Sequence, residues 1–120
     1  MTTYIQTSGD FDKLEPVMRF EAQQELLGFL ERERDRFPDL YLHAHVKRLS
    51  ASLGSNLLLR CSLTLRAGVN RFYVVEEGFG AEAAIRSALL ALRYQVDKFL
   101  EMKIDTREKA EGRRGVAEMS

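Results

Sequence analysis

The stretch NLLLRCSLTLRAGVNRFYVVEE, residues 56–77, decides the fold, because apolar and polar side chains alternate along both of its halves. In the first half the odd-numbered residues are apolar, whereas the even-numbered residues include Arg60 and Arg66. A period of two is typical of a strand with one buried face. Ala67-Gly68 predicts a short turn, so the two halves form an antiparallel hairpin.

Two further strands precede this hairpin. Residues 40–47 alternate in the same way, with leucine, alanine and valine on one side and tyrosine, histidine and lysine on the other. This pattern predicts a half-buried strand, which the loop at residues 50–55 separates from the next one. Residues 2–8 are rich in threonine and include Tyr4 and Ile5, which is typical of a short strand.

Two helices are predicted from apolar residues that recur every three or four positions. Asp12 and Glu15 have the spacing of a capping box and Pro16 suits a first helical turn, so one helix begins within residues 12–16 and ends near Arg36. The other extends from about residue 81 to residue 102. Their buried positions are Ala22, Leu26, Phe29, Leu30 and Phe37 in the first and Ile85, Leu89, Leu92, Val96 and Phe99 in the second.

These elements predict one domain of the α+β class over residues 1–103. Residues 104–120 lack apolar periodicity, which favours a flexible C-terminal tail. No apolar run approaches the roughly 20 residues that span a bilayer, and the N-terminus lacks the features of a secretory signal. We therefore expect a cytoplasmic protein.

Few residues of this chain are typical of a metal or cofactor site. The single cysteine, Cys61, lies in an alternating apolar run and is expected to be a buried thiol. His43 and His45 share a strand face, but two imidazoles alone make an incomplete metal site. We therefore expect no metal and no cofactor.

The segment EEGFGAEAAIR, residues 76–86, contains a G-x-G pair where a strand gives way to a helix. It lacks both the GxxxxGK[ST] pattern and the third glycine of a dinucleotide fingerprint, and its three glutamates would repel a pyrophosphate. A strand-to-helix junction is the better interpretation. Because no catalytic motif is found elsewhere, we expect that the protein is not an enzyme.

The polar face of the predicted sheet is the most informative group of residues. Arginine and tyrosine are the side chains that phosphate contact and base stacking require, although charge on an open face also serves solubility alone. The net charge is zero, so nucleic-acid binding is permitted rather than demanded. The face comprises Tyr41, His43, His45, Lys47, Arg60, Ser62, Thr64, Arg66, Arg71 and Tyr73, and a basic flank of Arg86, Arg93 and Lys98 lies on the last helix.

Residues 71–99, RFYVVEEGFGAEAAIRSALLALRYQVDKF, resemble the last hairpin and helix of the ribosome hibernation-promoting factors and ribosome-associated inhibitors, once called sigma-54 modulation proteins. The resemblance extends over residues 3–103. The chain departs from the family pattern at Gly80, Glu82 and Arg86, where aspartate, tyrosine and aspartate are usual. Matching positions are Glu77, Gly78, Ala83, Ala84, Ile85, Leu92, Gln95 and Lys98.

The resemblance implies a βαβββα fold with two helices on one face of a mixed four-stranded sheet, similar to double-stranded RNA-binding domains. It also implies binding to the small ribosomal subunit and its 16S-type rRNA, where the protein would exclude messenger and transfer RNA and keep ribosomes inactive under stress. It implies a short form, with no membrane partner. The expected RNA-binding residues are Lys47, Arg48, Arg60, Arg66, Arg71, Tyr73, Arg86, Arg93 and Lys98.

A second interpretation keeps the same fold without ribosome binding. Leu90 and Tyr94 are expected to be exposed on the last helix, where they could form a protein-interaction or self-association surface. A homodimer is one form of this alternative.

Overall fold

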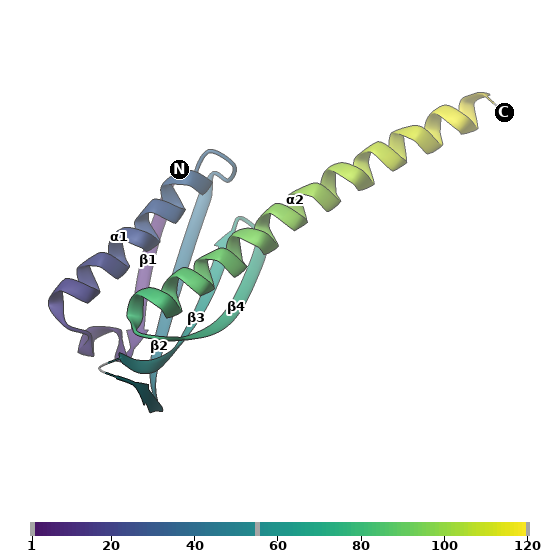
Figure 1. Cartoon of the computed structure of the whole chain (residues 1–120). Coiled ribbons are helices and arrows are strands. Elements are labelled where there is room, and N and C mark those ends of the chain that lie inside the picture. Colours follow the sequence, from purple (N-terminus) through teal and green to yellow (C-terminus); the bar gives the residue numbers. More distant parts are fainter. Residues whose placement is uncertain (1, 55, 120) are drawn as a thin grey trace.

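The structure, a computed structural model, describes residues 2–54 and 56–119 of the 120-residue chain, with side chains described for residues 3–54 and 56–102. Four strands and two helices follow one another in the predicted order (Figure 1). The elements are β1 (Thr2–Gly9), the short 3₁₀ helix η1 (Asp10–Lys13), α1 (Pro16–Glu33), β2 (Asp39–Leu53), β3 (Asn56–Ala67), β4 (Asn70–Phe79) and α2 (Ala81–Met119).

The strands form one sheet in the order β1-β2-β3-β4. β1 and β2 are parallel, and the other neighbours are antiparallel, which confirms the predicted mixed sheet. Both helices lie on the same face of this sheet (Figure 1). No helix formed by the described residues covers the opposite face, which is called the open face below.

The core lies between the sheet and the helices. Leu42, Leu63 and Leu65 from the sheet and Leu26 and Leu92 from the helices are fully buried. Every position predicted for the two apolar stripes is buried, except that Phe99 is only half-buried. Its ring meets the ring of Phe72 edge-on, with centroids 5.4 Å apart. The periodicity of the sequence therefore identified the core correctly.

The ends of the predicted elements differ from those observed. α1 begins at Pro16 but has no capping box, because Glu15 is the N-cap and makes no side-chain cap hydrogen bond. The helix ends at Glu33 rather than near Arg36. Glu33 is buried, and its carboxylate accepts a hydrogen bond from Arg36 at 3.2 Å.

Two elements are longer than predicted. β2 continues to Leu53 through the expected loop, because a shift in register between Arg48 and Ser52 lets its end pair again with β3. α2 passes the predicted end at residue 102 and extends beyond the sheet to Met119 (Figure 1). The flexibility predicted for residues 104–120 stays a prediction, because the side chains of this segment lie outside those that the structure describes.

The G-x-G pair forms the predicted junction between β4 and α2. Gly80 has a φ of 97°, which favours glycine, and its amide donates to the carbonyl of Leu57 at 2.8 Å. A Cβ on Gly78 would lie 2.6 Å from the amide nitrogen of Ala84. Both glycines are therefore explained by backbone geometry.

Candidate nucleic-acid interface

The open face is built from rows of side chains that run across the four strands. In the first row Tyr4 of β1 pairs with Tyr41 of β2, Tyr41 pairs with Arg66 of β3, and Arg66 pairs with Arg71 of β4. Because side chains alternate along each strand, the next row on this face begins two residues further on. The face therefore presents an ordered array of polar and aromatic groups.

The first row holds a stack of two tyrosines and one arginine. The rings of Tyr4 and Tyr41 are stacked, with centroids 5.3 Å apart and an interplanar angle of 12°. The Cζ atom of Arg66 lies 5.8 Å from the centroid of the Tyr41 ring. The hydroxyl of Tyr41 donates a hydrogen bond to Gln6, which holds the stack to β1. These contacts fix the Tyr41 ring between Tyr4 and Arg66.

Arg66 and Arg71 place two like charges directly opposite each other at the end of this row. Neither guanidinium has a carboxylate partner among the side chains of residues 3–54 and 56–102. Like charges in direct cross-strand positions destabilise a sheet. An anion bound between the two groups would remove that cost.

The second and third rows contain the two histidines. The hydroxyl oxygen of Ser8 lies 2.7 Å from Nε2 of His43 and 2.8 Å from Nδ1 of His45, which links β1 to β2. Among the described residues, no three histidine, cysteine or acidic side chains are placed to hold a metal ion. Tyr73, at the β4 end of the second row, has 57% of its surface exposed.

The fourth row carries a neutralised arginine. Arg60 donates two hydrogen bonds to Oε1 of Glu77, from Nε at 3.1 Å and from Nη2 at 2.9 Å. Lys47, its cross-strand neighbour on β2, is exposed and has no acidic partner among the described side chains. Lys47 is therefore the more available cation of this row.

The remaining predicted RNA-binding residues do not lie on the open face. Arg48 follows Lys47 and so points to the opposite side of the strand, and its backbone amide donates to Asp10 at 2.8 Å. That hydrogen bond lowers the pKa of the Asp10 carboxyl. Arg93 and Lys98 are exposed on α2, and Nζ of Lys98 lies 5.9 Å from the ring centroid of Tyr94.

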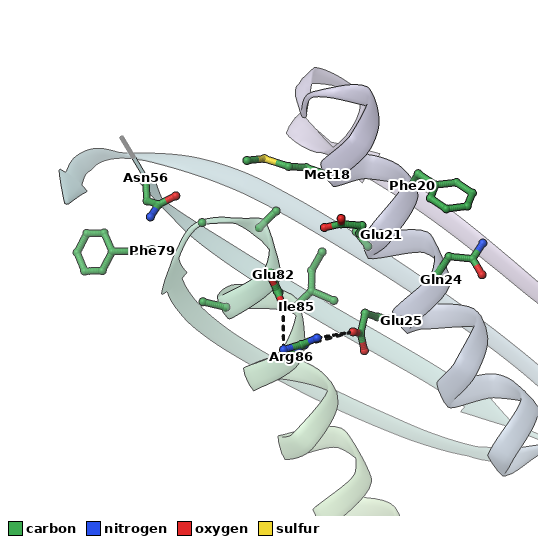
Figure 2. A pocket seen from close by; sticks show the side chains of 14 residues that line it. Met18, Phe20, Glu21, Gln24, Glu25, Asn56, Phe79, Glu82, Ile85 and Arg86 are labelled. Carbon is green, nitrogen blue, oxygen red and sulfur yellow. Dashed lines mark hydrogen bonds and ion pairs between the residues drawn. The ribbon is translucent and has the colours of Figure 1, made fainter. Parts of the chain in front are cut away.

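Arg86 is held by two carboxylates from different helices. It contacts Glu25 of α1 at 3.0 Å and Glu82 of α2 at 2.8 Å (Figure 2). The hydrogen bond to Glu25 is the main reason that the pKa of Arg86 is raised. This guanidinium is therefore engaged in joining the helices, and its charge is balanced locally.

The structure thus divides eight of the nine predicted RNA-binding residues between two surfaces, and the ninth, Arg48, points away from the open face. The open face brings together Lys47, Arg60, Arg66, Arg71 and Tyr73. Arg86, Arg93 and Lys98 lie on the outer surface of α2, on the other side of the core. The two predicted partner-interface residues, Leu90 and Tyr94, also lie on this outer surface, with 68% and 64% of their areas exposed.

A groove of about 700 Å³ separates the first turns of α1 from the start of α2 (Figure 2). Three carboxylates line it, those of Glu21, Glu25 and Glu82, together with apolar groups such as Met18 and Phe79. Acidic walls repel phosphate. The groove is therefore a poor RNA site.

Sequence reasoning missed the contribution of β1 to the open face. Tyr4, Gln6 and Ser8 are brought beside Tyr41, His43 and His45 by parallel pairing of β1 with β2. Their period of two was visible in the sequence, but the register of a parallel pair is set by the connecting helix and by packing.

Within the described part of the chain, no helix combines the length and the apolar character that a membrane span needs.

Comparison with known proteins gives a match in structure and none in sequence. No protein-family model and no curated protein matches the sequence. The N-terminal domain of Protein Y from Thermus thermophilus superposes with a TM-score of 0.52 at 19% identity, covering 82% of this chain and 94% of that one. A ribosomal subunit interface protein from Coxiella burnetii gives 0.50 at 12% identity, covering 84% and 99%. The resemblance inferred from the sequence is confirmed at the level of structure: this chain has the βαβββα fold of those two proteins.

Proposed function

We propose that this chain is a cytoplasmic, ribosome-associated translation inhibitor of the hibernation-factor type, which binds the small ribosomal subunit and blocks its messenger and transfer RNA sites. The observation that carries the proposal is an open face with aromatic rings and three cations, Lys47, Arg66 and Arg71, that have no acidic partner among the described side chains, on a fold shared with a ribosomal subunit interface protein. The protein blocks these sites sterically, and contacts between its basic side chains and rRNA phosphates hold it in place. This mechanism requires no cofactor and no chemical step.

The open face is the proposed rRNA contact. Lys47, Arg66 and Arg71 have no acidic partner among the described side chains, so their charge is available to phosphate. Arg60 contributes less, because Glu77 already accepts its hydrogen bonds. Arg86 contributes little for the same reason. Three further predicted residues are proposed to contact rRNA only at the periphery of this surface: Arg48, Arg93 and Lys98.

The experiment that tests occlusion uses purified small subunits loaded with a labelled messenger or a labelled transfer RNA. Saturating protein should displace both labels, and it should inhibit translation in a reconstituted system. A variant with Lys47, Arg66 and Arg71 changed to alanine should displace neither. If the wild-type protein binds the subunit and both labels stay bound, the occlusion mechanism is overturned.

A second candidate function rests on the outer surface of α2. Leu90 and Tyr94 together expose large apolar area one helical turn apart, which is typical of a protein contact. Light scattering tests the self-association form of this proposal with Tyr94→Glu. Val69→Glu is a matched control, because Val69 is fully exposed in the β3–β4 turn. A wild-type monomer that neither substitution alters would remove self-association.

A further inference from the structure

We infer that the first row of the open face, with Tyr73 beside it, binds an unpaired segment of RNA by stacking its bases on tyrosine rings and holding its backbone between Arg66 and Arg71. The inference rests on the proposed function for the identity of this RNA as ribosomal. It adds the class of ligand, single-stranded rather than duplex RNA, and it adds Tyr4 as a binding residue.

The first argument is the state of the aromatic rings. Tyr41 is covered on its two sides by Tyr4 and Arg66, so it supports the stack and offers little free surface. Tyr4 ends the stack and exposes 55% of its area, and Tyr73 exposes 57% on the far strand. A base can stack on an aromatic side chain only where a face of the ring is exposed and the ring is kept in position.

The second argument is the spacing of these rings. Tyr4 lies on β1 and Tyr73 on β4, at opposite edges of a four-stranded sheet. With neighbouring strands about 4.8 Å apart, the edges are separated by roughly 14 Å. A four-stranded sheet with surface aromatics of this kind accommodates two or three stacked bases. The platform is therefore wide enough for more than one nucleotide.

The third argument is charge. Arg66 and Arg71 face each other without a carboxylate among the described side chains. Arg66 lies on β3, between the strands that carry the two exposed rings, and Arg71 lies on β4 two residues before Tyr73. The ion pair of Arg60 and Glu77 lies on the fourth row, toward the opposite end of the face. A phosphate bound by both guanidinium groups would connect bases that stack on either side of it.

The preference for unpaired RNA follows from what each form of RNA exposes. In a duplex the bases are stacked on one another and present only their edges, so a tyrosine ring has no base face to contact. Phosphates are present in both forms, so arginine contacts alone do not favour unpaired RNA. The aromatic rings of the open face therefore give it a preference for unpaired RNA over duplex RNA.

The test measures the anisotropy of a labelled oligouridylate and of a labelled blunt RNA duplex with the full chain. Wild-type protein should bind the oligouridylate more tightly than the duplex. The variant Tyr4→Leu/Tyr73→Leu should lose at least about fivefold in affinity for the oligouridylate and change little for the duplex. Tyr4→Phe/Tyr73→Phe, which keeps both rings, should bind the oligouridylate as tightly as the wild-type protein. Tyr94→Leu is the matched control, because Tyr94 lies on the outer surface of α2.

Tighter binding of the duplex, or unchanged affinity in the double leucine variant, would overturn the inference. The double leucine variant is checked by circular dichroism, and a loss of affinity in the phenylalanine variant would show that the hydroxyl groups rather than the stacked rings bind the RNA. Cosedimentation with small subunits distinguishes the two proposals. Subunit binding that does not depend on the tyrosines would overturn the stacking site alone, whereas tyrosine-dependent RNA binding without subunit binding would overturn the ribosomal function alone.

Discussion

Arg66 of β3 and Arg71 of β4 are direct cross-strand neighbours, and neither has a carboxylate partner among the described side chains. Arg60 and Arg86, in contrast, are paired with carboxylates, those of Glu77 and Glu25. The Arg66–Arg71 couple is therefore a place where the sheet accepts like charges in directly opposite positions. Such an arrangement is expected where an anionic ligand supplies the missing charge.

Changing Arg71 to glutamate should stabilise the protein and weaken its binding to ribosomes at the same time. Glutamate opposite Arg66 turns a repulsive pair into an attractive one, which is worth about 0.2–1 kcal/mol in a cross-strand position. Urea unfolding should report a higher midpoint, and cosedimentation with small subunits should fall. Arg71→Lys is the control that retains the repulsion. A variant that is both more stable and fully bound would refute a functional role for the pair.

Changing Arg86 to glutamine should leave ribosome binding unchanged and lower thermal stability. The guanidinium links Glu25 of α1 to Glu82 of α2, and its loss leaves two acidic groups near each other. Since all these groups are exposed, the loss in melting temperature should shrink as salt is added. Arg71→Gln is the comparison for binding. Equal losses of subunit binding in the two variants would mean that the outer surface of α2 also contacts rRNA.

Adding one methyl group at Gly78 should destabilise the junction between β4 and α2. The new Cβ would lie 2.6 Å from the amide nitrogen of Ala84 and 2.9 Å from the carbonyl carbon of Ala83, so the backbone must shift. We expect a loss of about 1–3 kcal/mol in the free energy of unfolding, measured with urea.

The control for this prediction is Gly28→Ala in the interior of α1. No atom outside its own helical turn lies within 4 Å of a Cβ placed there, so alanine should raise stability by about 0.5–1 kcal/mol. If both substitutions stabilise the protein, the backbone of α2 does not lie as close to Gly78 in solution as the structure shows, and the prediction is wrong.

Stability should decline with pH above the ordinary pKa of a thiol. Burial raises the pKa of Cys61 from 9.0 to about 12, so the folded state binds a proton that the unfolded state has lost. The contribution is complete below pH 9 and disappears as pH rises toward 12, a change of up to about 4 kcal/mol. Urea unfolding of wild type and Cys61→Ala from pH 8 to 11 isolates this effect. Parallel curves for the two proteins would contradict it.

The open face could be predicted on three strands because alternation alone assigns each side chain to one face. Lys47, Arg60 and Arg71 were placed correctly by that pattern. What alternation does not encode is pairing over long distances in the chain. The contact of Arg86 with Glu25 joins residues 61 positions apart, and the stack of Tyr4 on Tyr41 depends on a parallel register. The sequence therefore located the charged side chains, whereas the structure was needed to show which of them are already paired with a carboxylate.

The boundaries of elements were less predictable for a related reason. The segment 50–55 has the composition of a loop, yet renewed pairing with β3 after the register shift keeps residues 50–53 in β2. Tertiary pairing here outweighs local preference. In contrast, the apolar stripe that includes Leu26 and Leu30 was correct at every position, since burial of one helix face dominates.

The central claim, that the open face binds the small subunit through phosphate contacts, is tested most directly by cosedimentation with purified small subunits over a range of salt concentrations. With Lys47, Arg66 and Arg71 as the contributing cations, the logarithm of affinity should fall with the logarithm of salt at a slope of about −2 to −3. Replacing all three with alanine should flatten that slope. No cosedimentation of the wild-type protein at low salt, or an unchanged slope in the triple variant, would contradict the account.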